Sequence, residues 1–206
     1  MDDKKEKLMA AAEKLMAVSG YEGTSTRKIA EEAGVNIAMI SYYFGSKEGL
    51  YHEMVANRIS YVRDTLRQLN ATVADPWERL EKIINFYVTS ILTRPNIHKI
   101  IHRQLSMSHR SGIQKKFAEM IKTSAMEMKL FLEEGQEKKA FRKIDTEMTM
   151  GTFIGTIFQM INSPMISAKF FGKAGINKDG SFNEIHQKRL SKHLKDLLTA
   201  HLKLDN

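Results

Sequence analysis

The sequence predicts an all-α protein of about nine helices. Proline occurs only at positions 76, 95 and 164, so few stretches are barred from helix formation. The chain is rich in Leu, Met, Ala, Lys and Glu, which are strong helix formers, and the period-two alternation typical of strands is scarce. At 206 residues the chain can bury a core of useful size, as one large domain or two smaller ones.

A first group of three short helices is expected before residue 50. Residues 3–19 carry apolar side chains at helical spacing, and Gly20 follows as a stop signal. Ser25 is a natural N-cap for a second helix, and Gly34 supplies the left-handed residue that ends it. A third helix is expected after Asn36, with its buried side formed by Met39, Ile40 and Tyr43 or Phe44.

The rest of the chain reads as longer helices. Ser46 caps a helix to about residue 70, and Asp75 with Pro76 starts another to about residue 93. Further helices are expected over about 95–107, 112–136, 145–160 and 181–203, the last with a capping box at Ser181. The eighth could extend past Pro164 with a kink or break. We place the domain boundary near residue 50, which gives domains 1–50 and 51–206.

The positive charge of the chain is not concentrated near its N-terminus. The formal net charge is +8, yet residues 1–60 hold eight Lys/Arg and nine Asp/Glu, so the excess lies in residues 61–206. Any argument for DNA binding must therefore rest on pattern. The chain has no cysteine, which excludes disulfides and thiolate metal sites and fits a reducing cytoplasm. No uninterrupted run of about 18 apolar residues is present, so we expect neither a transmembrane helix nor a membrane partner.

Residues 25–48 have the pattern of a helix-turn-helix. In this motif a first helix holds a second at a fixed angle, and the second enters the major groove of DNA. The motif requires small residues at the turn, a short second helix with one apolar side, and outward groups for bases and phosphates. The stretch supplies each feature, with Ile37, Ala38, Ser41 and Tyr42 left to face outward.

The same stretch resembles the DNA-binding domain of TetR-family transcriptional regulators over about 55 residues. The resemblance is carried by residues 20–35, from Gly20 through Ile29-Ala30-Glu31-Glu32-Ala33-Gly34-Val35, and by residues 41–48, Ser41-Tyr42-Tyr43-Phe44-Gly45-Ser46-Lys47-Glu48. Beyond them only the length and the helical pattern match. The family implies an N-terminal helix-turn-helix domain of three helices and a larger C-terminal helical domain for ligand binding and dimerisation.

The resemblance implies roles for individual residues. Tyr43 and Lys47 stand where the family contacts phosphate. The start of the second helix stands where the family meets DNA backbone or a base edge, which gives Ser25, Thr26 and Arg27 that role, and Lys28 beside them adds a positive charge to the DNA-binding set. The positions that read bases follow the turn, and they are Asn36, Ile37, Ala38, Ser41 and Tyr42. Ile37, Ser41 and Lys28 depart from the residues common in the family, and the first two leave the operator sequence open.

The resemblance also implies a function. We expect a homodimeric repressor that binds a palindromic DNA operator and is released by a small molecule. An activator or architectural DNA-binding protein without ligand control is the alternative. No phosphate loop, catalytic triad or carboxylate pair favours an enzyme, and no cofactor is expected. A helical adaptor that binds only protein remains a further reading.

The larger half is rich in Met and Phe, which suits an adaptable pocket for an apolar or aromatic effector. An ordinary helical core explains the same composition. The candidate effector-binding residues are Phe86, Tyr87, Gln104, Met107, Phe117, Met120, Met126, Phe153, Phe158 and Gln159.

Two helices are candidates for the dimer interface. Gly151 and Gly155 lie one turn apart on the helix from residue 145, which permits close helix contact. Together with the last helix they would form a four-helix interface between subunits. The candidate residues are Gly151, Gly155, Ile185, Leu190, Leu194, Leu197 and Leu198.

Three histidines could form a metal site, as an alternative function of this region. His98 and His102 are one helical turn apart and His109 is near in sequence, which is possible spacing for zinc. Lys99 and Arg103 flank the pair and disfavour a cation, so no metal is expected.

Overall fold

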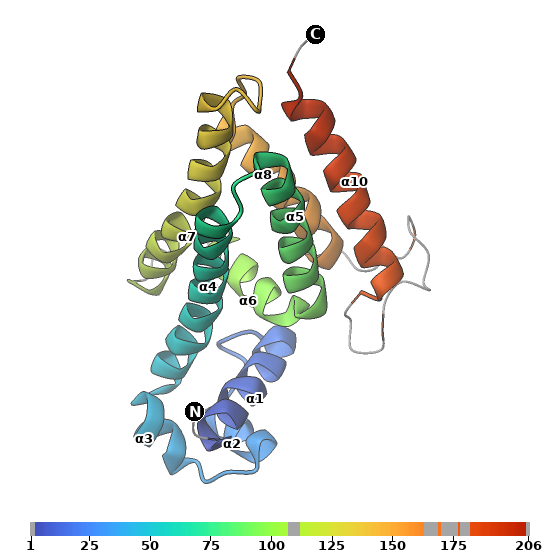
Figure 1. Ribbon diagram of the computed structural model, residues 1–206. Coiled ribbons are helices and arrows are strands. Elements are labelled where there is room, and N and C mark those ends of the chain that lie inside the picture. The colour runs from blue at the N-terminus through green and yellow to red at the C-terminus, as the bar shows by residue number, and fades with distance from the viewer. Residues whose placement is uncertain (1–2, 107–111, 163–168, 170–176, 178–181, 205–206) are drawn as a thin grey trace. The chain divides into compact units, whose positions relative to one another are not determined.

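The prediction of an all-α fold is confirmed. A computed structural model describes residues 3–106, 112–162, 169, 177 and 182–204 (Figure 1). For residues 104–106 and 112–117 it describes the backbone alone. The described part contains nine helices, which are α1 (Asp3–Ser19), α2 (Thr26–Ala33), α3 (Ala38–Phe44), α4 (Lys47–Thr72), α5 (Pro76–Thr93), α6 (Pro95–Ser106), α7 (Gly112–Glu137), α8 (Thr146–Asn162) and α10 (Glu184–Leu202). Within it, no helix is both long and apolar enough to cross a bilayer.

Helix boundaries follow the local signals closely, with one correction. The side chain of Asp75 accepts from Glu78 N at the start of α5, and that of Asp145 accepts from Met148 N at the start of α8. The last helix begins three residues later than the expected 181, because the Asn183 side chain caps it by accepting from His186 N. Ser181, the expected cap, and Pro164, the expected kink, lie outside the described residues.

The chain packs as two compact units. One comprises Met1–Tyr61 and Asn96–Ile121, and the other comprises Val62–Pro95 and Lys122–Asn206. The division falls inside α4 and α7, because both helices contribute residues to each unit. A boundary near residue 50 remains a prediction about domains, but the packing places most of α6 with the N-terminal helices.

The core of the first unit joins α1, α2 and α3 to the start of α4 and to α6. Its fully buried members come from all five helices: Leu8, Ala12, Met16, Ile29, Ile40, Leu50, Tyr51, Val55, Ile97. Helix α1 packs against both α2 and α3, and α2 packs against α3 (Figure 1). This core is what holds the short helices α2 and α3, of eight and seven residues, which would be marginal on their own.

A buried polar pair ties α4 to α6 within this unit. Arg58 and His98 are 9% and 6% exposed, and His98 Nε2 lies 3.2 Å from Arg58 Nε and 3.0 Å from Arg58 Nη2. Since guanidinium only donates, His98 Nε2 must accept, which requires a neutral imidazole with its proton on Nδ1. The pair therefore fixes both the register of the two helices and the tautomer of the histidine.

The second unit is built around α5, which packs against α8 and α10 (Figure 1). Its core contains an aromatic group in which Phe141 meets Trp77 edge-on at 4.9 Å and Phe131 at 5.6 Å between ring centroids. The Gly135 backbone lies directly under Phe141, so a Cβ placed there would come within 2.1 Å of its ring. Glycine is therefore required at 135 by close packing.

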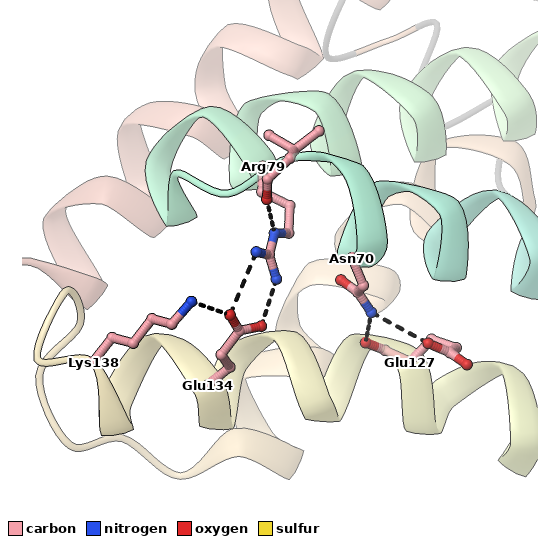
Figure 2. A network of polar contacts seen from close by, with 6 residues as sticks. Asn70, Arg79, Glu127, Glu134 and Lys138 are labelled. Carbon is pink, nitrogen blue, oxygen red and sulfur yellow. Dashed lines mark hydrogen bonds and ion pairs between the residues drawn. The ribbon is translucent and has the colours of Figure 1, made fainter.

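Figure 2 shows the polar network that joins α5 to α7. Arg79 is only 2% exposed; its Nε donates to the Val73 carbonyl at 2.7 Å and its Nη1 lies 2.6 Å from a carboxylate oxygen of Glu134. Hydrogen bonds from Arg79 and Lys138 hold the pKa of Glu134 below its ordinary value. The buried guanidinium is thus paired on both sides, as a buried charge requires.

Candidate nucleic-acid interface

Helix α2 begins and ends as its sequence predicts. The Ser25 side chain accepts from Lys28 N at 3.2 Å, which satisfies one of the free amides of the first turn. At the other end Gly34 adopts φ +64°, and Val35 N donates to the Ala30 carbonyl at 3.0 Å. These bonds form the C-terminal motif in which a left-handed glycine terminates the helix, so the chain turns sharply into α3.

The N-cap position of α3 is Ile37, which makes no side-chain cap bond, so the expectation that Asn36 caps this helix is corrected. Asn36 lies one residue earlier, and its side-chain oxygen accepts from Ala38 N at 2.8 Å as part of the turn. Ile40 is 2% exposed and anchors the helix in the core, while Met39 is half-buried. Gly45 ends the helix at φ +74°, and Ser46 then caps α4 by accepting from Gly49 N at 3.0 Å.

The expected reading face is open to solvent. Tyr42 is 75% exposed and Ile37 48% exposed, although both are large apolar groups that a core would otherwise bury. The other expected reading residues that are exposed lie on the turn, on α3 and at the start of α2: Ser25, Arg27, Lys28, Asn36, Ala38, Ser41. Thr26 is half-buried. The geometry therefore brings one exposed face together from three short segments.

Tyr43 and Phe44 form the edge of that face. Tyr43 meets Tyr42 edge-on at 4.9 Å and Phe44 at 6.2 Å between centroids, and both Tyr43 and Phe44 are half-buried. Lys5 Nζ lies 5.5 Å from the centre of the Phe44 ring. Phe44 therefore packs against the edge of the first unit's core, and Tyr43 keeps part of its ring at the surface.

Lys47 has a position that local sequence pattern could not indicate. Its Nζ donates to the carbonyls of Tyr21 at 3.0 Å and Thr24 at 3.1 Å, and it lies 4.2 Å from the centre of the Tyr21 ring. Tyr21 packs on buried Tyr51 at 4.9 Å, and burial is the first cause that raises the pKa of the Tyr21 hydroxyl, followed by Glu48 and Glu22. Lys47 thus anchors the link between α1 and α2.

Two further lysines of this unit are held by ion pairs across helices. Lys14 of α1 pairs with Glu32 of α2 at 2.5 Å, and Lys5 of α1 pairs with Glu53 of α4 at 2.7 Å. Arg27 lies 3.3 Å from Glu31 on the same helix but is 82% exposed at its side chain. These three positive charges are therefore paired with carboxylates of the same unit, at least two of them at the surface.

Comparison with known proteins identifies the motif. The family profile described as "Bacterial regulatory proteins, tetR family" matches residues 8–54, which span α1, α2, α3 and the start of α4. Residues 8–54 therefore belong to the tetR family. The capped helices, the left-handed turn glycine and the exposed face of α3 therefore form the helix-turn-helix of a DNA-binding transcriptional regulator.

Curated relatives of this chain are named as transcriptional regulators. The HTH-type transcriptional repressor NicS of Pseudomonas putida is 29% identical over 119 residues, which is 53% of this chain and 56% of NicS. The chain spans about two thirds or less of the length of the curated relatives that it matches.

Solved structures share the whole fold at low identity. A Clostridium perfringens fatty acid metabolism regulator superposes with a TM-score of 0.78 at 18% identity, covering 97% of this chain and all of that one. The Bacillus subtilis FadR in complex with stearoyl-CoA gives 0.72 at 19% identity, covering 96% and 99%. The prediction of a larger helical domain after the helix-turn-helix is thus confirmed at the level of the fold.

The candidate effector residues do not lie together in one group. Phe86, Tyr87, Phe153 and Phe158 belong to the core of the second unit, where Tyr87 meets Phe153 edge-on at 5.3 Å and burial raises the pKa of the Tyr87 hydroxyl. The others are scattered or undescribed. Met120 packs in the first unit, Met126 and Gln159 are exposed, the side chains of Gln104 and Phe117 are not described, and Met107 lies outside the described residues.

Two cavities of the second unit are lined by other residues. An open groove of about 540 Å³ runs between α5 and α10, and the residues that line it include Glu81, Asn85, Gln187 and Lys195. A mostly apolar hollow of about 210 Å³ lies between α8 and α10. Neither contains a residue of the candidate effector set.

The candidate dimer residues divide into two kinds. Leu190, Leu194 and Leu198 are 8%, 0% and 3% exposed and belong to the core of their own unit, so the expectation that they face a partner is corrected. Gly151 and Gly155 are exposed, and a Cβ at either would meet nothing within 4 Å. Ile185 and Leu197 are also exposed, at 72% and 39%.

The histidine alternative gains no geometric support. His98 is engaged by Arg58 in the buried pair, His102 is exposed, and His109 lies outside the described residues. Among the residues that the structure describes, no three His, Cys, Asp or Glu side chains come together as metal ligands.

Proposed function

We propose that this protein is a homodimeric repressor that binds a two-fold symmetric DNA operator and leaves it when a small apolar effector binds. The observation that carries the DNA-binding part is the exposed surface at α3, where Ile37 directly before the helix and Tyr42 within it are exposed to solvent although the unit has an apolar core. Large exposed apolar groups on a short, well-anchored helix suit contact with thymine methyls and base edges. The repressor role is supported by the name of NicS.

Selection of bound duplexes from a random pool tests the DNA-binding proposal directly. We expect enrichment of one sequence with two inverted half-sites whose centres lie about one helical turn, or a multiple, apart. The matched control is the double variant Ile37→Ser, Tyr42→Ser, which changes only exposed side chains of the reading face. Enrichment of the same sequence by this variant, or no enrichment by the natural protein, would contradict the proposal.

The proposed dimer face lies on α8 and α10. Met148 is 69% exposed, and together with Thr152 and Leu197 it lines the apolar hollow between these helices. Gly151 and Gly155 lie on the same helix as Met148 and leave open space above their backbone. Such a surface of small and apolar groups permits close approach of two copies of the same helix pair.

The effector is proposed to be a molecule with a long apolar chain. Support comes from the aromatic group around Tyr87 and Phe153 in the core of the second unit, with Phe86 and Phe158 half-buried beside it. It also comes from the stearoyl-CoA bound by FadR, a protein with the same architecture. Side chains of this kind bind apolar chains through area and shape.

Titration of the protein–operator complex tests the effector. Stearoyl-CoA, free stearate and coenzyme A without an acyl chain are added in separate experiments, and operator affinity is measured by fluorescence anisotropy. We expect the acylated ligand or the free acid to release DNA and coenzyme A alone to leave it bound. Release by none of the three would contradict an effector of this chemistry and would favour DNA binding without such control.

A further inference from the structure

We propose that Lys47 is a positioning residue that locks the start of α2, and that Lys28 supplies the phosphate-contacting charge of this face. This assignment moves to Lys28 the phosphate contact that the resemblance gives to Lys47, and it rests on the proposed DNA binding. Three observations carry it: the contacts of Lys47, the segment that those contacts hold, and the open position of Lys28.

The Lys47 ammonium is engaged inside the protein. Two of its three protons go to the carbonyls of Tyr21 and Thr24, at 3.0 and 3.1 Å, and its charge faces the Tyr21 ring at 4.2 Å. The side chain is also half-buried. Moving this group to a phosphate would break two charge-assisted hydrogen bonds and a cation–π contact, each of which costs free energy.

The two carbonyls belong to the link that sets the direction of α2. Thr24 is 1% exposed, and its hydroxyl donates to the Gly20 carbonyl at 2.8 Å, so the link is closed on itself. Ser25, the N-cap of α2, follows Thr24 directly. Because Lys47 is the first residue of α4, its bonds hold the start of α2 to the start of α4, and residues 25–28 take their positions from that tie.

Lys28 lies in the first turn of α2 and is exposed. Its backbone N–H bonds to the Ser25 cap, which fixes where the side chain leaves the helix. Among the described residues, no carboxylate pairs with its ammonium, whereas Lys5 and Lys14 of the same unit are tied to Glu53 and Glu32. Lys28 can therefore reach a phosphate without breaking an internal contact.

The salt dependence of operator binding separates the two roles. A lysine that neutralises one phosphate contributes about 0.9 to the slope of log K against log salt concentration, whereas a positioning residue contributes nothing to it. We expect Lys28→Met to lower the magnitude of this slope by about 0.9. We expect Lys47→Met to leave the slope unchanged and to weaken binding about tenfold at every salt concentration, the size of one charge-assisted hydrogen bond.

Two further measurements complete the test. In free Lys47→Met, the amides of Thr24 and Lys28 should exchange hydrogen faster than in the natural protein, and in Lys28→Met they should not. Lys47→Arg, which keeps a donor and a cation over the Tyr21 ring, should restore affinity and amide protection. A slope that falls by about 0.9 in Lys47→Met with unchanged exchange would overturn the assignment, whereas a natural protein that binds no duplex would overturn the proposed function instead.

Discussion

At the scale of single residues, the structure assigns tasks that residue type alone leaves open. Arg79 and Glu134 illustrate this, because both could be surface charges by sequence, yet Arg79 is 2% exposed and takes its partner from another helix. Gly135 is similar, since only its position beneath Phe141 explains why a glycine occupies the interior of α7. Each position gives a prediction about stability.

Replacing Glu134 by Gln should lower stability and change its dependence on pH. Arg79 and Lys138 hold the pKa of the Glu134 carboxyl below the ordinary 4.5, so the folded state binds its proton less readily than the unfolded state. The stabilisation is therefore complete above pH 4.5 and is lost as pH falls through the lowered folded pKa. Urea unfolding should show a loss of about 1–2 kcal/mol at pH 7 and a smaller difference at low pH.

The exposed pair Lys188 and Glu184 offers a control for that experiment. The two side chains are 80% and 83% exposed, and Lys188 Nζ lies 3.3 Å from a carboxylate oxygen of Glu184. Glu184→Gln should change stability little at any pH, because exposed pairs contribute little. Equal effects of the two substitutions would contradict the role given to the buried guanidinium.

Gly135→Ala should destabilise the second unit by about 1–3 kcal/mol, because the added methyl group would overlap the buried Phe141 ring. Thermal unfolding followed by circular dichroism measures the effect. Glu137→Ala, two residues further along and exposed, is the matched control and should be close to neutral. An unchanged melting temperature for Gly135→Ala would show that Phe141 can move aside.

At the scale of helices and turns, the turn between α2 and α3 makes the clearest prediction. Gly34 sits at φ +64° with open space where a Cβ would be, so alanine there would suffer backbone strain alone. Gly34→Ala should cost about 1–2 kcal/mol of stability, whereas Gly34→Asn should cost less because asparagine tolerates this conformation. Denaturant unfolding measures both, and equal losses would contradict strain as the cause.

The helix boundaries were predictable because their signals are local. Ser25, Gly34, Asp75 and Asp145 act through atoms within four residues along the chain, and each does what its pattern predicts. The last helix offers two capping residues two positions apart in sequence, and the observed cap is Asn183, whose side chain accepts from His186 N. Local signals therefore gave the elements and their ends to within a few residues.

The site was predictable only in part, because much of it depends on contacts between distant residues. The exposed face of α3 follows from its own apolar spacing, as Ile40 inward and Tyr42 outward show. The bonds of Lys47 to Tyr21 and Thr24 join residues 26 and 23 positions apart, and no local pattern reports them. The effector residues stay a prediction, and their placement in two different cores could not be read from the sequence, since Met and Phe enrichment does not say which core a side chain enters.

At the scale of the whole molecule, assembly is the main proposal that a single chain leaves to experiment. Gly151 has open space above its backbone, so a large side chain there should not disturb its own subunit. Gly151→Arg should therefore keep the helical content and melting behaviour of the monomer fold while shifting the sedimentation coefficient from that of a dimer to that of a monomer. Glu137→Arg, exposed on α7, is the control and should stay dimeric.

A dimeric Gly151→Arg variant would contradict the proposed face on α8 and α10. A monomeric one should also lose operator affinity, because two linked reading heads gain from binding the second half-site as an intramolecular event. The same variant should retain weak binding to a single half-site. Assembly and DNA recognition are thereby tested independently.

The ratio of affinities for the selected operator and for a scrambled duplex tests most directly the claim that the exposed face of α3 reads DNA. Tyr42 is the residue to change, because it is 75% exposed and its removal leaves the core intact. Tyr42→Ala should lower the ratio by about tenfold or more, since one lost base contact costs about 1–3 kcal/mol, while binding to the scrambled duplex stays the same. An unchanged ratio would contradict the account.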